Sequence, residues 1–238
     1  RNEIVARQFI MRMKEFEQME MQFFCKPGTE KEWYEHWKAW RMKWHETLGT
    51  QSEKLRYHDH VKLAHYANAA VDIEYDFPFG FKEVEGIHSR TDFDLKQHEE
   101  FSGKKLRYFD AESNESYVPY VVETSIGLDR LFLMTLSEAY TEENVNGDTR
   151  TVLKLHPAIA PIQCAILPLV KKYGLPELAE KIYQDLPFDF SVFIEDNDSI
   201  GKRYRRMDAL GTPFCVTVVP VGFPLGVVPL RSRASLVQ

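Results

Sequence analysis

The sequence contains few cysteines and no long apolar run. Its three cysteines, Cys25, Cys164 and Cys215, lie far apart, and no Cys-x-x-Cys pair occurs. This spacing argues against a zinc ribbon or a disulfide framework and suits the reducing cytoplasm. No run of about 18 apolar residues is present, so we expect no membrane span. Neither the glycine pattern of P-loops nor that of dinucleotide-binding folds occurs, which argues against both classes of nucleotide site.

Charge is distributed unevenly along the 238 residues, which are enough for two ordinary domains. Residues 150–238 carry 11 Lys and Arg against 8 Asp and Glu, a charge of +3, whereas residues 1–149 carry −9 of the overall −6. The polar segment 142–148 is the best linker candidate. We therefore predict an acidic domain at 1–149 and a mildly basic domain at 150–238 that touches a polyanion. Chance variation between two solvated surfaces is the alternative.

Apolar periodicity predicts a different fold class on each side of this linker. Before it, we expect helices at 30–48, 52–70 and 127–140 and strands at 71–81, 81–88, 106–110 and 117–125, an α+β arrangement. After it, strands at 161–169, 188–194 and 214–219 alternate with helices at 175–186 and 199–210. This alternation is typical of a small α/β sheet.

The first residues combine side chains that suit a nucleotide and an amine. Residues 1–24 are predicted to form a hairpin-like pair of strands, on which the even spacing of Arg12, Phe16 and Glu20 would place all three on one face. An arginine can hold phosphate, an aromatic ring can stack on a purine, and a carboxylate can bind an amine. The alternative is an ordinary surface sheet with alternating charge.

Two further segments carry candidate site residues. Residues 123–130 run from a strand into a helix, where Gly127 would permit a close turn and Arg130 could reach back to a polyphosphate. Glu83 and Glu85 alternate on a predicted strand, so we expect them on one face, where carboxylates could hold Mg²⁺ or an ammonium group. A solvated helix terminus and a salt-bridged turn are the respective alternatives.

Three histidines, His58, His60 and His65, lie close together in the sequence. Their spacing matches no strong metal-binding signature, and they fall in a segment that we expect to be an exposed helix. The sequence therefore predicts no metal site in this segment.

Taken in order, these segments resemble class II aminoacyl-tRNA synthetases. Arg1-x-Glu3 followed by Arg12-x-x-x-Phe16 resembles motif 2 of that class, and Gly127-Leu128-Asp129-Arg130 resembles motif 3. With residues 83–95 and 123–130, the match is to glycyl-tRNA synthetase of the dimeric type. Residues 150 to about 218 resemble its anticodon-binding domain. The resemblance implies a partial antiparallel-sheet catalytic core followed by an α/β anticodon-binding domain.

The resemblance implies a ligase that uses ATP with Mg²⁺ to activate glycine and transfers it to tRNA(Gly) in the cytoplasm. Arg1 and Arg130 would be catalytic, stabilising charge on the phosphates. The implied ATP-binding residues are Arg1, Asn2, Glu3, Arg12, Met13, Phe16, Glu83, Val84, Gly127 and Arg130. The implied glycine-binding residues are Phe16, Glu20, Glu123, Thr124 and Ser125. The implied tRNA-binding residues are Lys202, Arg203, Arg205 and Arg206.

The sequence departs from that family at both ends. Nothing corresponding to motif 1, which builds the homodimer interface of the full-length parent, precedes Arg1. The residues from about 219 onward do not resemble the family. We therefore expect a fragment that is inactive, or nearly so, on its own. A non-catalytic synthetase-like RNA-binding protein is the alternative, although the retained arginines Arg1, Arg12 and Arg130 argue against it.

Overall fold

The computed structural model describes residues 1–7, 9–145, 147–186, 189–220 and 230–232. The chain divides into two compact units, Arg1–Ser137 and Glu138–Gln238. Among the described residues, no helix combines the length and the apolar character needed to cross a bilayer.

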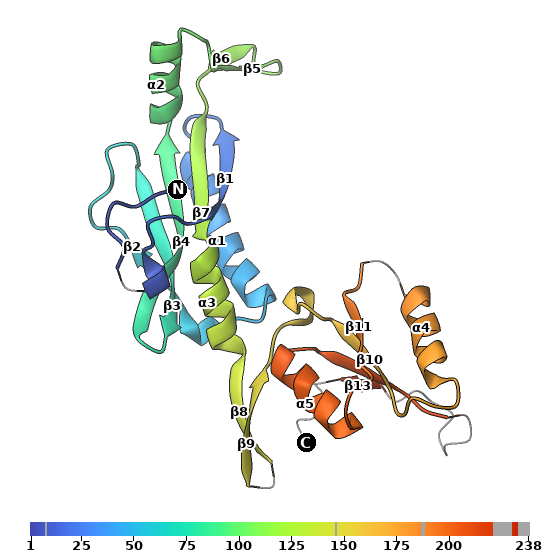
Figure 1. The fold of residues 1–238 in the computed structure, drawn as a ribbon. Coiled ribbons are helices and arrows are strands. Elements are labelled where there is room, and N and C mark those ends of the chain that lie inside the picture. The colour runs from blue at the N-terminus through green and yellow to red at the C-terminus, as the bar shows by residue number, and fades with distance from the viewer. Residues whose placement is uncertain (8, 146, 187–188, 221–229, 233–238) are drawn as a thin grey trace. The chain divides into compact units, whose positions relative to one another are not determined.

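The first unit is built on a five-stranded antiparallel sheet with the strand order β1-β7-β4-β3-β2 (Figure 1). Its strands are β1 (Gln18–Cys25), β2 (Leu55–Asp59), β3 (Ala69–Phe77), β4 (Gly80–Thr91) and β7 (Tyr120–Gly127). Three helices accompany them: α1 (Glu30–Thr47), α2 (Phe93–Ser102) and α3 (Leu128–Ala139). Short helical turns span η1 (Phe9–Met11) and η2 (Ser52–Lys54). Helix α2 and the small hairpin of β5 (Tyr108–Asp110) and β6 (Glu115–Tyr117) project beyond one end of this sheet.

One face of this sheet forms the core of the first unit. Val71, Ile73 and Ile87 are fully buried there, and Trp37 and Trp44 of α1 pack against the same cluster. The helix predicted at 30–48 is thus confirmed, and these two rings serve packing. Strand side chains alternate between faces, so the opposite face of the sheet is left for polar residues.

A buried ion-pair cluster fastens α1 to the sheet. Glu85 on β4 is fully buried and accepts hydrogen bonds from Arg41 at 2.5 and 3.2 Å and contacts His45 Nε2 at 2.8 Å. Glu83, two residues earlier, is exposed on the other side, because the register between β3 and β4 slips at Ile73 and Glu74. The expectation that Glu83 and Glu85 share a face is therefore wrong: a β-bulge breaks the alternation.

Two other local expectations are also corrected. The predicted helix at 52–70 is instead η2, β2 and the start of β3, because the segment pairs with its neighbours in the sheet. Residues 1–16 form an irregular hairpin held by isolated bridges between Asn2 and Glu15 and between Arg7 and Arg12, and regular strand begins only at Gln18. Even spacing on one strand therefore does not apply to Arg12 and Phe16.

The second unit begins with a hairpin and continues as an α/β sheet. Strands β8 (Tyr140–Val145) and β9 (Asp148–Leu153) pair antiparallel. Residues 142–145 and 148 of the predicted linker thus lie in regular strands, and the predicted boundary after residue 149 falls within β9. A four-stranded sheet with the order β11-β10-β12-β13 follows. Its elements are β10 (Cys164–Pro168), β11 (Val192–Ile194), β12 (Phe214–Val218) and β13 (Leu230–Ser232), with η3 (Pro157–Ile159), α4 (Leu175–Asp185) and α5 (Ile200–Leu210).

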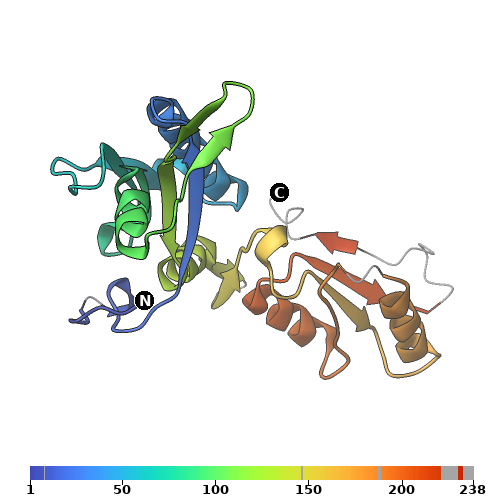
Figure 2. The same ribbon diagram turned by 90° about the horizontal axis from the view of Figure 1, so that it is seen from above.

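Alternate side chains of β10 pack against two different helices, one on each face of this sheet. Ala165 and Leu167 pack with Met207 of α5, whereas the alternate residue Ile166 packs with Ala179 of α4. Helices α4 and α5 therefore cover opposite faces of the sheet, and they lie apart in both views (Figures 1 and 2). The central strand is parallel to β11 and β12, as the alternation of strands and helices predicts. Most of the residues after 219, for which the sequence predicts no family resemblance, lie outside the described residues.

Candidate active site

The polar face of the first sheet collects side chains from three neighbouring strands. On β1, Glu20 and Gln22 stand opposite Ser125 and Glu123 of β7. The pairing of β7 with β4 continues these rows to positions 86 and 88. Residues opposite each other on antiparallel strands project from the same face, so this register brings the two predicted glycine-binding carboxylates together.

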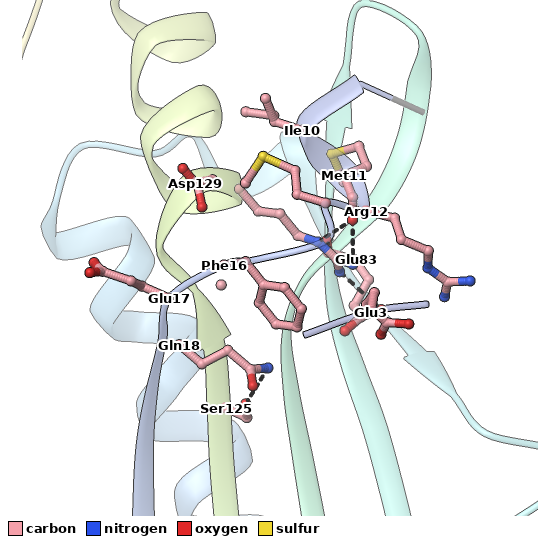
Figure 3. Close-up of a pocket in the computed structure, with 13 residues that line it drawn as sticks. Glu3, Ile10, Met11, Arg12, Phe16, Glu17, Gln18, Glu83, Ser125 and Asp129 are labelled. Carbon is pink, nitrogen blue, oxygen red and sulfur yellow. Dashed lines mark hydrogen bonds and ion pairs between the residues drawn. The ribbon is translucent and has the colours of Figure 1, made fainter. Parts of the chain in front are cut away.

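A pocket of about 190 Å³ lies where this face meets the start of α3. Phe16 projects into it, with Gln18 and Ser125 on one side and Glu83 on another (Figure 3). Seven of the predicted ATP-binding residues line this pocket: Glu3, Arg12, Met13, Phe16, Glu83, Gly127 and Arg130. Five other lining residues were not among the predicted site residues: Ile10, Met11, Glu17, Gln18 and Asp129. They flank the motif residues in sequence, and that proximity is the signal that could have found them.

Arg130 is already held firmly at the edge of this pocket. Its Nε and Nη2 donate to the carbonyl oxygen of Met11 at 3.1 and 2.7 Å, and its Nη1 lies 3.1 Å from the Glu83 carboxylate. These contacts tie the first turn of α3 to η1 and β4. A guanidinium fixed in this way can present its charge to an anion in the pocket.

The turn from β7 into α3 does not depend on Gly127, although the sequence predicts that this glycine permits a close turn there. A Cβ on Gly127 would meet the Arg130 side chain, whose nearest atom, Cδ, would lie 3.5 Å away, which is ordinary contact, so the strand-to-helix junction does not require glycine for its fold. The glycine does keep the pocket wall free of a side chain at that point.

Arg1 and Glu20 form a cation–anion pair beside the pocket. Arg1 Nη1 lies 3.1 Å from Glu20 Oε1, and the Ser125 hydroxyl donates to the same oxygen at 3.4 Å. Gln18 donates to Ser125 Oγ at 3.1 Å and so fixes the hydroxyl. Three predicted site residues from two parts of the sequence are thus in direct contact.

Glu123 is the more deeply buried of the two carboxylates, with 8 % of its surface exposed. Arg90 Nη1 donates to both of its oxygens at 3.0 and 3.1 Å, and Gln22 donates to one of them at 2.5 Å. Arg90 and Gln22 were not identified from the sequence. The even spacing of Gln18, Glu20 and Gln22 on β1 was the signal that could have found Gln22.

Histidine 88 borders the same carboxylate. Its Nδ1 lies 3.8 Å from Glu123 Oε1. Burial lowers the pKa of His88, and this effect outweighs the opposing attraction of the Glu123 and Asp72 carboxylates.

Two predicted site residues lie on the wrong side of the sheet. Val84, with 1 % of its surface exposed, belongs to the core cluster, so its side chain cannot line an ATP site. Thr124 is also buried, on the face opposite its neighbours Glu123 and Ser125, because strand residues alternate. Asn2 is exposed in the irregular N-terminal hairpin and does not line the pocket.

The basic residues of α5 differ in their exposure to solvent. Arg203 is 2 % exposed, and it donates to the carbonyl oxygens of Pro168, Glu195 and Leu169. Its prediction as a tRNA contact is corrected: the side chain ties α5 to the ends of β10 and β11. Lys202, Arg205 and Arg206 are exposed, although Arg206 also pairs with Glu195 and Asp198.

Comparisons with known proteins cover both units of the chain. Residues 163–238 match the family described as HGTP_anticodon, an anticodon binding domain. This match includes the residues from about 219 onward, so the expectation that they do not resemble the family is wrong. The chain is 54% identical over 239 residues to a glycine–tRNA ligase of Chlorobaculum tepidum, covering all of this chain and 51% of the relative. It is 56% identical over 241 residues to that of Macrococcus caseolyticus, covering all of this chain and 52% of the relative.

A solved structure supports the fold independently. Prolyl-tRNA synthetase of Giardia lamblia, in complex with prolyl-adenylate, superposes with a TM-score of 0.59 at 18% identity, over 89% of this chain and 42% of the other. The whole chain is therefore similar in sequence to glycine–tRNA ligases, its second unit matches an anticodon binding domain, and its fold is like that of the prolyl-tRNA synthetase. The chain spans about half the length of the curated relatives it matches.

Proposed function

We propose that this chain supplies the ATP and glycine sites and the anticodon-binding module of a glycine–tRNA ligase. Its substrates would be ATP, glycine and tRNA(Gly). The observation that carries the proposal is the placement of Glu20, Glu123 and Ser125 on one sheet face beside the Arg130 pocket. The identity of 54–56% to two curated glycine–tRNA ligases over the whole chain supports it.

The two carboxylates suit an amino acid that has no side chain. Glycine offers only an ammonium group and a carboxylate, so a selective pocket needs anionic acceptors and little spare volume. Glu20 and Glu123 would accept from the ammonium group, and the Ser125 hydroxyl would add a further hydrogen-bond partner. Excluding a larger side chain by steric contact is easier than rejecting a smaller one, so glycine is the amino acid that this site can select most simply.

The pair of Arg1 and Glu20 complements the adenylate intermediate. In the reaction, the glycine carboxylate would attack the α-phosphate, which forms a C–O–P linkage and releases pyrophosphate. The product carries an ammonium group and a phosphate only a few bonds apart. Arg1 and Glu20 lie 3.1 Å apart, so one adenylate could exchange their mutual contact for two new ones. Arg130 would stabilise the charge at the other end of the polyphosphate.

The pocket has carboxylates that fit Mg²⁺. Glu3 and Glu83 line it, and Mg²⁺ in nucleotide sites is held by one or two carboxylates together with substrate phosphates. When bound, the ion would neutralise phosphate charge. Phe16 would stack on the adenine, with Arg12 and Met13 at the border of the nucleotide.

The second unit would contact the anticodon stem-loop through phosphate groups. Lys202, Arg205 and Arg206 are the exposed cations of α5 that could make such contacts. By the same homology, we propose that the full-length protein works as a homodimer in the cytoplasm.

Binding of a non-hydrolysable glycyl-adenylate analogue tests the proposal. Isothermal titration of the 238-residue chain should detect the glycyl analogue, and an alanyl analogue should bind about tenfold or more weakly because its methyl group has to be accommodated. No binding of either analogue, with tRNA binding retained, would favour a non-catalytic RNA-binding protein instead. Equal binding of both analogues would remove the assignment to glycine.

A further inference from the structure

Three side chains of the kinds that can bind metal ions meet on or beside neighbouring strands of the first sheet. His60 follows β2 directly, Asp72 lies on β3 and His88 lies on β4. One ligand atom of each lies within 4.8 Å of the other two, and all three residues are partly buried. His60 Nε2 is 2.9 Å from Asp72 Oδ2. The cluster therefore joins two imidazole nitrogens and one carboxylate oxygen.

The strand register explains why these residues meet. The His60 backbone N–H donates to the Ala70 carbonyl on β3, and His88 stands opposite Ala70 on β4. The two imidazole rings thus flank the same residue, with centroids 5.8 Å apart. Asp72 is two positions further along β3, on the same face. The convergence is a property of the sheet and involves no flexible loop tip.

Gly86 provides the space for this arrangement. Gly86 stands opposite Asp72, and a Cβ there would lie 2.7 Å from His88 Cε1 and 3.6 Å from Asp72 Oδ1. The His88 ring therefore lies over position 86 and towards the Asp72 carboxylate. Any side chain at this position would push the ring away from the cluster.

The second nitrogen of His88 also fits a ligand. Nδ1 is buried, has no hydrogen-bond partner among the described residues, and lies 3.8 Å from Glu123 Oε1. A carboxylate behind the distal nitrogen is the arrangement that orients metal-binding histidines. A small adjustment would let Nδ1 donate to Glu123 while Nε2 faces Asp72 and His60.

We propose that His60, Asp72 and His88 bind a divalent transition-metal ion of the Zn²⁺ type, with one coordination position left open. Imidazole suits Zn²⁺, Co²⁺ or Fe²⁺ and does not suit Mg²⁺ or Ca²⁺, which prefer oxygen ligands. Two histidines and one carboxylate with a free fourth position form a common tetrahedral Zn²⁺ arrangement. The site shares no ligand with the Glu3 and Glu83 carboxylates proposed for Mg²⁺.

The histidines that stand out in the sequence are a different set. His58 is exposed and lies beside Glu74, and His65 packs edge-on against Phe93 with ring centroids 4.8 Å apart. Only His60 of that trio reaches the cluster, while Asp72 and His88 come from two other strands. This explains why the local spacing predicts no metal site.

Metal titration of the untagged chain tests this proposal. The protein is stripped with a chelator, and Zn²⁺ is then titrated in competition with a chromophoric chelator, with Co²⁺ as a spectroscopic probe. We expect one equivalent of Zn²⁺ per chain and visible Co²⁺ absorption typical of tetrahedral coordination. Asp72→Asn and His60→Ala should each weaken binding by more than the roughly 10–100-fold that the loss of an outer partner costs.

His58→Ala is the matched control, because it removes an exposed imidazole of β2 that lies beside Glu74, two residues before His60. It should bind Zn²⁺ as the unchanged chain does, and circular dichroism should confirm that all variants are folded. Gly86→Ala should also weaken binding, because the new Cβ displaces the His88 ring. Equal Zn²⁺ affinity in the unchanged chain, Asp72→Asn and His60→Ala would overturn the proposal, as would no binding to the folded, unchanged chain.

Discussion

Arg90 donates through Nη1 to both carboxylate oxygens of Glu123, at 3.0 and 3.1 Å. Its Nε donates to Asp94 at 2.8 Å, and its guanidinium carbon lies 4.3 Å from the centre of the Tyr66 ring. These contacts fix the guanidinium on three sides. Glu123 is therefore held at one position on the polar sheet face, and Arg90 acts as a positioning residue for the proposed glycine site.

Arg90→Lys should weaken the glycyl-adenylate analogue about tenfold while leaving the chain folded. Lysine keeps the positive charge but cannot reproduce the planar fork that contacts Glu123 and Asp94 together, and one hydrogen bond to a charged group contributes roughly 1.5–3 kcal/mol. Isothermal titration measures the change. Arg107→Lys is the control, because Arg107 is exposed and contacts only Glu99 in the described structure. Unchanged affinity in Arg90→Lys would show that Glu123 does not depend on Arg90.

The buried Glu85 cluster predicts a large effect on stability. Arg41→Ala removes the arginine that donates twice to the fully buried Glu85 carboxylate, and it should lower the free energy of unfolding by about 3 kcal/mol because a buried charge loses its main partner. Urea denaturation followed by circular dichroism measures the change. Arg56→Ala, which breaks a pair between a half-exposed arginine and the less exposed Glu74, should cost less than about 1 kcal/mol. Similar losses in both variants would contradict the account of the core.

Two arginines of α5 should separate stability from RNA binding. Arg203→Ala leaves three buried carbonyl oxygens without their donor, so it should destabilise the chain by about 3 kcal/mol. Arg205→Ala removes an exposed cation and should leave the melting temperature unchanged while weakening tRNA binding and reducing its dependence on salt. Thermal unfolding and filter binding at two salt concentrations provide the readouts. A stable Arg203→Ala variant with weaker tRNA binding would reverse the assignments.

Regular periodicity predicted most of the fold. The tryptophan-bearing helix, the helix after Gly127 and the alternating elements of the second unit all form close to where the pattern places them. Glu20, Glu123 and Ser125, which the family resemblance groups in one site, lie on one face of the sheet, because they stand on regular paired strands. In these segments, local pattern and long-range pairing favour the same structure.

The errors arise where tertiary pairing decides the structure. The register shift between β3 and β4 places Glu83 and Glu85 on opposite faces of the sheet. No local pattern in the sequence predicts that bulge. Sheet pairing converted the predicted helix at 52–70 into strands. In the sequence, Arg203 is one of several neighbouring basic residues. The carbonyl groups to which it donates hydrogen bonds belong to the end of β10 and to the residue that follows β11. Such partners become visible only in three dimensions.

In the proposed function, Glu20 and Glu123 together bind the glycine ammonium group beside a phosphate-binding pocket. The most direct test is isothermal titration of the glycyl-adenylate analogue into the unchanged chain, Glu20→Gln and Glu123→Gln. Each substitution keeps the shape and removes one negative charge, so each should weaken the analogue at least about tenfold, the loss expected for one hydrogen bond to a charged group. ATP alone should bind all three proteins equally. Equal affinity of the analogue for all three folded proteins would contradict the claim.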